Sequence, residues 1–232
     1  MAREFRTLDV FTTETFGGNP LAVVMDGQGL STDDMQTIAA EFNLSETTFI
    51  LPPDDPANAA NVRIFTPKSE LPFAGHPTVG TAIVLAGEMH GDAYETELRL
   101  EEKVGLVKVE VSKAAGEPAY AQFSAAVMPE VGDGEPSAAA AAAAIGLLPE
   151  DIGFAGHEVG AVSAGNGFVF IPAANREALA RAWPDMTAWR AAGFPEGMVG
   201  VFAYTQGGES ADAHWRGRMF GPDQGIMEDP AT

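Results

Sequence analysis

FAGHPTVGTAIVLAG, at residues 73–87, is the stretch that decides the fold. It predicts a helix that begins at Pro77, because proline's missing N–H costs nothing in the first turn. Gly87 predicts the end of this helix, since glycine readily adopts the left-handed conformation found there. No residue between the two is charged. We therefore expect a buried helix, and it is too short to cross a bilayer.

The start of this helix predicts a binding site for an anion. The first N–H groups of a helix lack partners within it, and the positive end of the helix dipole lies there. We expect these donors to belong to Gly75, His76, Thr78 and Val79. Together they would suit a substrate carboxylate. An ordinary core helix with a satisfied cap explains the same residues, and from this stretch alone it is the preferred interpretation.

Composition bounds the class of protein. The chain has 232 residues, of which 46% are hydrophobic and 20% charged, which is typical of a folded protein with one large domain or two small ones. Its formal net charge of −20 argues against nucleic acid or an anionic membrane as a partner. There is no cysteine, so disulfides, thiolate metal sites and cysteine acid–base chemistry are excluded. Without a signal peptide or a transmembrane run, we expect a cytoplasmic protein.

The first part of the chain predicts strands and one amphipathic helix. Strands are expected at residues 8–12 and 21–25, joined by the glycine-rich turn at 16–20 as an antiparallel pair. Ser31 predicts the cap of a helix that ends at Asn43, with one apolar stripe facing the core.

Glu46 lies in the next predicted strand, residues 44–51, on the same face as Ile50. A carboxylate on that face is at risk of burial. Burial would raise the pKa of Glu46 toward neutrality and suit it to general acid–base work. An exposed glutamate at a strand end is the more common situation for a glutamate taken alone.

The remaining pattern predicts two related domains. Strands at 61–65, 94–100 and 106–111 complete a first domain, residues 1–115. We expect a linker at 114–118, and a strand at 120–125 that opens a second domain, residues 116–232. The Phe-Thr-Pro at 65–67 before the organising helix is echoed by Phe-Gly-Pro at 220–222 near the end. We expect an active site in a cleft between the domains. The sequence ends where a second such helix should begin, so we expect an incomplete second domain.

Several motifs, in order along nearly the whole chain, resemble those of the PhzF-like proteins of phenazine biosynthesis, relatives of diaminopimelate epimerase. Any one of them is weak, but the ordered set is specific. They are DVF at 9–11, GNPLAV at 18–23, NLSET at 43–47, RIFTP at 63–67, ELPFAGHPT at 70–78 and GIMEDPAT at 225–232.

The resemblance implies an α+β fold of two similar domains, each a curved, mostly antiparallel sheet wrapped around a central helix. It implies catalysis without a metal or organic cofactor, and often a homodimer. The acid–base glutamate of the family falls on Glu46, its active-site histidine on His76 and its aspartate on Asp229. Asn19, Gly75, His76 and Thr78 are the expected substrate-binding residues.

Our hypothesis is therefore an isomerase for a small carboxylate-bearing amino or hydroxy acid. Glu46 would remove a proton from one carbon and return it to another, while His76 would contact the substrate or orient Glu46. Asp229 would bind an amino or hydroxyl group. The alternative from another class is a non-catalytic small-molecule binder or interaction protein on the same fold. The other histidines lack metal-ligand spacing, and the sequence does not identify the substrate.

Overall fold

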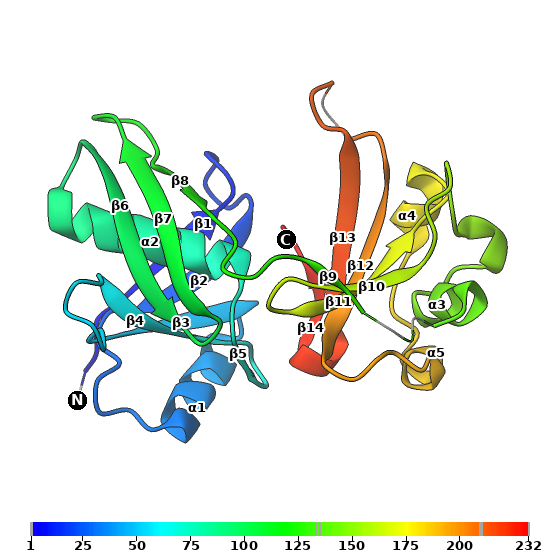
Figure 1. The fold of residues 1–232 in the computed structure, drawn as a ribbon, viewed down its shortest axis with the longest axis horizontal. Coiled ribbons are helices and arrows are strands. Elements are labelled where there is room, and N and C mark those ends of the chain that lie inside the picture. Colours follow the sequence, from blue (N-terminus) through cyan, green and yellow to red (C-terminus); the bar gives the residue numbers. More distant parts are fainter. Residues whose placement is uncertain (1, 133, 135, 209–210, 232) are drawn as a thin grey trace. The chain divides into compact units, whose positions relative to one another are not determined.

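The chain forms two compact units, Met1–Met128 and Pro129–Thr232. Their structure is a computed structural model that describes residues 2–132, 134, 136–208 and 211–231, so Thr232 of the last motif lies outside it. Both units combine strands with helices, as Figure 1 shows, and the predicted α+β class is confirmed. Among the described residues, no helix has the length and apolar character that crossing a membrane requires.

The first unit contains an eight-stranded sheet in the order β1-β2-β3-β4-β6-β7-β8, with β5 paired to β4. Most neighbours are antiparallel, but β2–β3 and β4–β6 are parallel. The predicted antiparallel pair β1–β2 is confirmed. The strands are β1 (Phe5–Val10), β2 (Asn19–Val24), β3 (Glu46–Leu51), β4 (Ala60–Phe65), β5 (Glu70–Leu71), β6 (Tyr94–Glu102), β7 (Gly105–Lys113) and β8 (Tyr120–Phe123).

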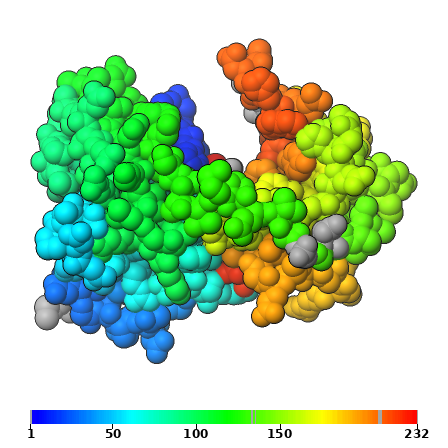
Figure 2. All heavy atoms as spheres, in the orientation of Figure 1, coloured from blue at the N-terminus to red at the C-terminus, as the bar shows by residue number. Residues whose placement is uncertain are grey.

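Helix α2 (Gly75–His90) is enclosed by this sheet. It contacts β1, β2 and β3 on one side and β6, β7 and β8 on the other, so the sheet curls around it. In the space-filling view, β6 and β7 lie over the helix on the face shown (Figure 2). The expected buried helix is therefore confirmed, and it positions the candidate site.

The bounds of α2 differ from the prediction. Ala74 is the N-cap, so Pro77 is the third helical residue rather than the first. Proline fits there equally well, because the N–H groups of the whole first turn lack helical acceptors. The helix also continues past Gly87 and ends at Gly91, which has a positive φ of 82°. Sequence alone could not choose between the two glycines.

Helix α2 approaches β1 and β2 closely at Gly80. A methyl group added at Gly80 would lie 2.6 Å from Leu21 Cδ2 and 2.9 Å from Val10 Cγ2. Glycine is therefore required here by space rather than by backbone conformation. The close approach seats the first turns of α2 against the strand that begins with Asn19.

Helix α1 (Thr32–Phe42) covers the other face of the sheet. Ser31 and Asp34 form a reciprocal capping box, and Asn43 ends the helix with a left-handed φ of 52°, both as predicted in position. Met35 packs with Phe49 and Phe65, whereas α2 packs with Ile50 of β3 and with Leu21 and Val23 of β2. The strand that carries Glu46 is thus held between two helices.

The boundary between the units falls later than predicted. The prediction that residues 120–125 open the second domain is wrong, because β8 pairs antiparallel with β7 in the first sheet. The stretch at 114–118, predicted to be a linker, is instead the turn of this hairpin, with Gly116 at a φ of 76°. A hairpin turn and a linker have the same composition, so the sequence did not separate them.

The second unit is a six-stranded sheet in the order β14-β13-β12-β11-β10-β9. Small side chains of its helices pack with Val169, Ile171, Val201 and Phe220 to form the core. The strands are β9 (Glu130–Val131), β10 (Gly160–Ser163), β11 (Gly167–Pro172), β12 (Met198–Gln206), β13 (Trp215–Gly221) and β14 (Ile226–Asp229). The helices are α3 (Ala138–Ala144), α4 (Arg176–Arg181) and α5 (Met186–Ala191), with 3₁₀ turns η1 (Pro149–Asp151) and η2 (Pro222–Gln224).

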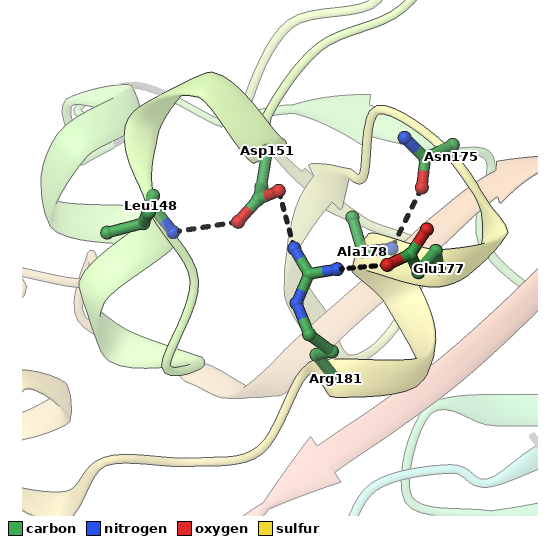
Figure 3. Close-up of polar contacts among 6 residues, drawn as sticks. All are labelled: Leu148, Asp151, Asn175, Glu177, Ala178 and Arg181. Carbon is green, nitrogen blue, oxygen red and sulfur yellow. Dashed lines mark hydrogen bonds and ion pairs between the residues drawn. The ribbon is translucent and has the colours of Figure 1, made fainter.

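A polar network joins η1 to α4 (Figure 3). Asp151 accepts from the Leu148 N–H at 3.1 Å and from Arg181 Nη2 at 2.7 Å. The Leu148 N–H and the Arg181 guanidinium hold the pKa of the Asp151 carboxyl below its usual range. Asn175 caps α4 by accepting from the Ala178 N–H. These contacts hold η1 and α4 together in the unit that carries Asp229.

Candidate active site

Three of the predicted site residues lie together in the first unit. Asn19 begins β2, Glu46 begins the parallel neighbour β3, and His76 lies in the first turn of α2. All three are buried, with 0%, 5% and 4% of their surfaces exposed. The chain thus gathers an amide, a carboxyl and an imidazole at one end of the enclosed helix.

His76 is the centre of this group. Its Nδ1 lies 3.1 Å from Asn19 Nδ2 and 3.5 Å from Glu46 Oε2. An amide nitrogen can only donate, so Nδ1 accepts from Asn19 and the proton of the neutral ring is on Nε2. Phe11 contacts the ring edge to face, with centroids 6.5 Å apart. The prediction gave Asn19 a contact with substrate, and the structure shows in addition that it holds His76.

A second contact ties the strand of Glu46 to the helix of His76. The hydroxyls of Thr48 and Thr81 are 2.9 Å apart and both are buried. Thr48 lies two residues after Glu46, on the same face of β3. Strand and helix are therefore joined by both packing and a hydrogen bond, which limits how far Glu46 can move relative to His76.

The first turn of α2 presents fewer free donors than predicted. The Thr78 N–H donates to the Ala74 carbonyl at 3.1 Å, so the expectation that Thr78 offers its N–H is wrong. The reason is that the helix begins at Gly75 and not at Pro77, which makes Thr78 and Val79 too late to lack helical acceptors. Gly75 remains at the positive end of the dipole, as predicted.

Thr78 is connected to a residue that the sequence analysis missed. Its hydroxyl lies 2.8 Å from the Ala74 carbonyl and 2.7 Å from Glu102 Oε1. Glu102 is the last residue of β6 and only 7% exposed. A signal was available, because Leu98, Leu100 and Glu102 share the inward phase of this strand. The expected contact between Thr78 and substrate stays a prediction.

Burial raises the pKa of the Glu102 carboxyl to about 8, and the hydrogen bond from Thr78 opposes this rise. Its Oε2 atom has no hydrogen-bond partner among the described residues. Glu102 is therefore a second buried carboxyl near the start of α2.

Asp229 lies in the second unit, at the end of β14 and opposite Met219 of β13. It is 6% exposed. Its predicted role beside Glu46 and His76 stays a prediction. Within the described part of the chain, no three His, Asp or Glu side chains are grouped as a metal ion would require.

The chain shares its fold with solved structures of more distant sequence. The probable proline racemase of Agrobacterium radiobacter matches with a TM-score of 0.60 at 12% identity, over 98% of this chain and 73% of that one, which shows the fold alone. Residues 8–232 match the PhzC-PhzF family model, described as phenazine biosynthesis-like protein, and the chain belongs to this family.

The relatives place the chain in a family of isomerases. An uncharacterised isomerase of Mesorhizobium japonicum is 46% identical over 99% of this chain and 76% of its own length. The trans-2,3-dihydro-3-hydroxyanthranilate isomerase of Pseudomonas aeruginosa is 36% identical over 97% of this chain and 74% of its own length. A PhzF-family protein of Bacillus anthracis has a TM-score of 0.83 at 26% identity, over 100% of this chain and 77% of that one.

Proposed function

We propose that this protein is a cofactor-independent isomerase that moves a proton between two carbons of a small amino or hydroxy acid. The Glu46 carboxylate takes a proton from one carbon, and the electron pair left behind is shared with a neighbouring double bond. The protonated Glu46 then returns the proton to a carbon two positions away. The double bond shifts, no electrons are gained or lost, and Glu46 is restored.

The observation that carries this proposal is the buried group of Asn19, Glu46 and His76. A buried carboxyl beside an imidazole is the arrangement expected of a general acid–base pair. Burial opposes the charge on Glu46. The neutral imidazole, whose Nδ1 lies 3.5 Å from Glu46 Oε2, would orient the Glu46 carboxyl. Asn19 fixes which ring nitrogen faces the carboxylate.

The start of α2 would receive the carboxylate of the substrate. Gly75 lies at the positive end of the helix dipole. This local positive potential contrasts with the formal net charge of the chain, which is −20. Negative charge that develops next to this carboxylate during proton removal would be stabilised by the same N–H groups. Asp229 is proposed to bind an amino or hydroxyl group. The cleft between domains, the homodimer and the cytoplasmic location are untested expectations.

The substrate class follows from the relatives. Those named trans-2,3-dihydro-3-hydroxyanthranilate isomerase act, by name, on a cyclic amino acid with a carboxylate and a hydroxyl group. Loops vary more among relatives than the elements they connect, so 36% identity does not fix the shape of the pocket. We therefore propose the class of small unsaturated amino or hydroxy acids rather than one compound.

Proton exchange from carbon tests the proposal directly. The full chain is incubated in deuterated water with a panel of cyclic and acyclic amino and hydroxy acids, and loss of C–H signal is followed by NMR. We expect exchange with at least one unsaturated acid, and none with Glu46→Gln. A folded protein that binds a carboxylate but exchanges no proton across the panel would favour a non-catalytic binding protein.

A further inference from the structure

The alternation of side chains along β1 is interrupted where the strand ends. Val10 is buried and packs with Leu21 and with Val79 of α2. In an extended strand the next side chain would point to the opposite face of the sheet. Phe11 has a positive φ of 62° instead, and its ring contacts the ring of His76, which also belongs to α2. Two consecutive side chains therefore contact the same helix.

The backbone conformation that brings Phe11 to this position is unfavourable. A left-handed φ is uncommon for a bulky residue such as phenylalanine, and it persists where the surrounding structure imposes it, often at ligand sites. Here the loop after β1 is fixed by its own hydrogen bonds. Asp9 Oδ2 accepts from the Phe16 N–H at 2.8 Å, and the Thr12 hydroxyl accepts from the Glu14 N–H at 3.0 Å. The folded loop thus holds the Phe11 ring beside His76.

Packing against His76 uses only part of the Phe11 surface. The two ring centroids are 6.5 Å apart and the ring planes are inclined at 67°. Phe11 is nevertheless 54% exposed, whereas Val10 before it is 2% exposed. An aromatic side chain that contacts a site residue and keeps about half of its surface open offers a flat apolar surface to a ligand at that site.

We propose that Phe11 is a specificity-determining residue, which selects substrates whose carboxylate is attached to a flat unsaturated ring. The proposal rests on the proposed function in placing the substrate carboxylate at the start of α2, next to His76. The proton shift needs a carbon–carbon double bond beside the carbon that loses its proton, so the reacting part of the substrate is flat. The Phe11 ring packs on this part by offset or edge-to-face contact, which a puckered saturated ring makes poorly.

The test compares two acids of the same charge, 2-hydroxybenzoate and cis-2-hydroxycyclohexanecarboxylate, which differ in the flatness of their rings. Affinity is measured by titration, and the ¹⁵N signals of the His76 ring report binding at this site. The wild type should prefer the flat acid by about threefold to tenfold, the range expected of one aromatic contact. Phe11→Leu keeps the apolar bulk without the aromatic face and should lose this preference. Phe11→Tyr keeps the ring and should retain it.

Phe5→Leu is the matched control. Phe5 begins β1, at the opposite end from Phe11, is 51% exposed and packs edge to face on Phe42. This variant loses a ring of similar exposure and should keep the wild-type preference. Phe11→Met, which has an unbranched side chain, replaces Phe11→Leu if the latter does not fold. An unchanged preference in the folded Phe11 variant would overturn the proposal, and so would an equal loss in Phe5→Leu.

Affinity needs no turnover, so the measurement separates this proposal from the proposed function. If Phe11 sets the preference but no acid of the panel exchanges a C–H proton, the proposed function fails and the selection of flat rings stands. If unsaturated acids exchange in Phe11→Leu with wild-type ratios of KM, the role of Phe11 fails and the isomerase stands. A wild type that binds neither acid at His76, or binds both equally, also overturns the role of Phe11.

Discussion

His76 Nδ1 lies 3.5 Å from Glu46 Oε2, although the two residues come from a helix and a strand that are far apart in the sequence. Glu46 should therefore be indispensable to proton transfer and dispensable to folding. Glu46→Gln is nearly isosteric, so we expect turnover to fall by about 10²–10⁴-fold, the usual contribution of a general acid–base group. The measurement is C–H exchange in deuterated water. Retained exchange in a folded Glu46→Gln protein would refute the mechanism.

Asn19 should matter through His76. Asn19→Ala removes the donor to Nδ1 and leaves a small cavity at a fully buried position. We expect a loss of stability of about 1–3 kcal/mol and a change in the ¹⁵N shifts of the His76 ring. Urea unfolding and NMR measure the two effects. Asn58→Ala, which removes a contact to Glu101 in the same unit, should lower stability without altering the His76 ring.

Glu102 should make the first unit less stable as pH rises. Burial raises its pKa in the folded chain to about 8, compared with 4.5 for an unperturbed glutamate. Between these values the unfolded chain has lost the proton and the folded chain keeps it, so stability falls by about 1.4 kcal/mol for each pH unit. Below pH 4.5 both states are protonated, and above pH 8 the fall stops.

Glu102→Gln should cancel this slope. At pH 4 the variant and the wild type should agree within about 1 kcal/mol, whereas at pH 8 the variant should be more stable by about 3–5 kcal/mol. Denaturant unfolding at a series of pH values measures the difference, in which all other titrations cancel. Parallel pH profiles for the two proteins would show that Glu102 ionises freely in the folded state.

Two glycines of α2 should respond in opposite directions to the same substitution. Gly80→Ala places a methyl group 2.6 Å from Leu21 Cδ2 in a filled core, so we expect a net loss of about 1–2 kcal/mol. At Gly87 the nearest atom is the Tyr94 hydroxyl oxygen at 4.0 Å, so Gly87→Ala should gain up to about 1 kcal/mol from helix propensity. Thermal unfolding of both variants checks this, and equal shifts would contradict the close packing at Gly80.

Sequence patterns within a few residues located the ends of a helix correctly. Features that depend on residues distant in the sequence were misplaced. The Ser31 cap and the Asn43 end of α1 depend on neighbours within a few residues, so composition was sufficient to locate them. The end of α2 was misplaced because Gly87 and Gly91 are equivalent as residues and differ only in what surrounds them. The hairpin turn at 114–118 was taken for a linker for the same reason.

The candidate site shows a similar division. Glu46 and His76 could be named because the motifs around them resemble a known family. The bond from Asn19 to His76 spans 57 positions, and no pattern within either segment indicates it. Glu102 was detectable in principle, since it continues the inward phase of Leu98 and Leu100. A charged residue in that phase was overlooked because glutamate is usually exposed.

The two parallel pairings of the first sheet also set the order in which the site can form. Each needs a crossover: α1 joins β2 to β3, and α2 lies on the path from β4 to β6. Non-local contacts of this kind form slowly, since loop closure precedes any gain from pairing. Asn19, Glu46 and His76 therefore meet only after both crossovers have closed. A nascent or partly folded chain would contain Glu46 without its buried contact to His76, so the proposed proton exchange should appear only as refolding completes.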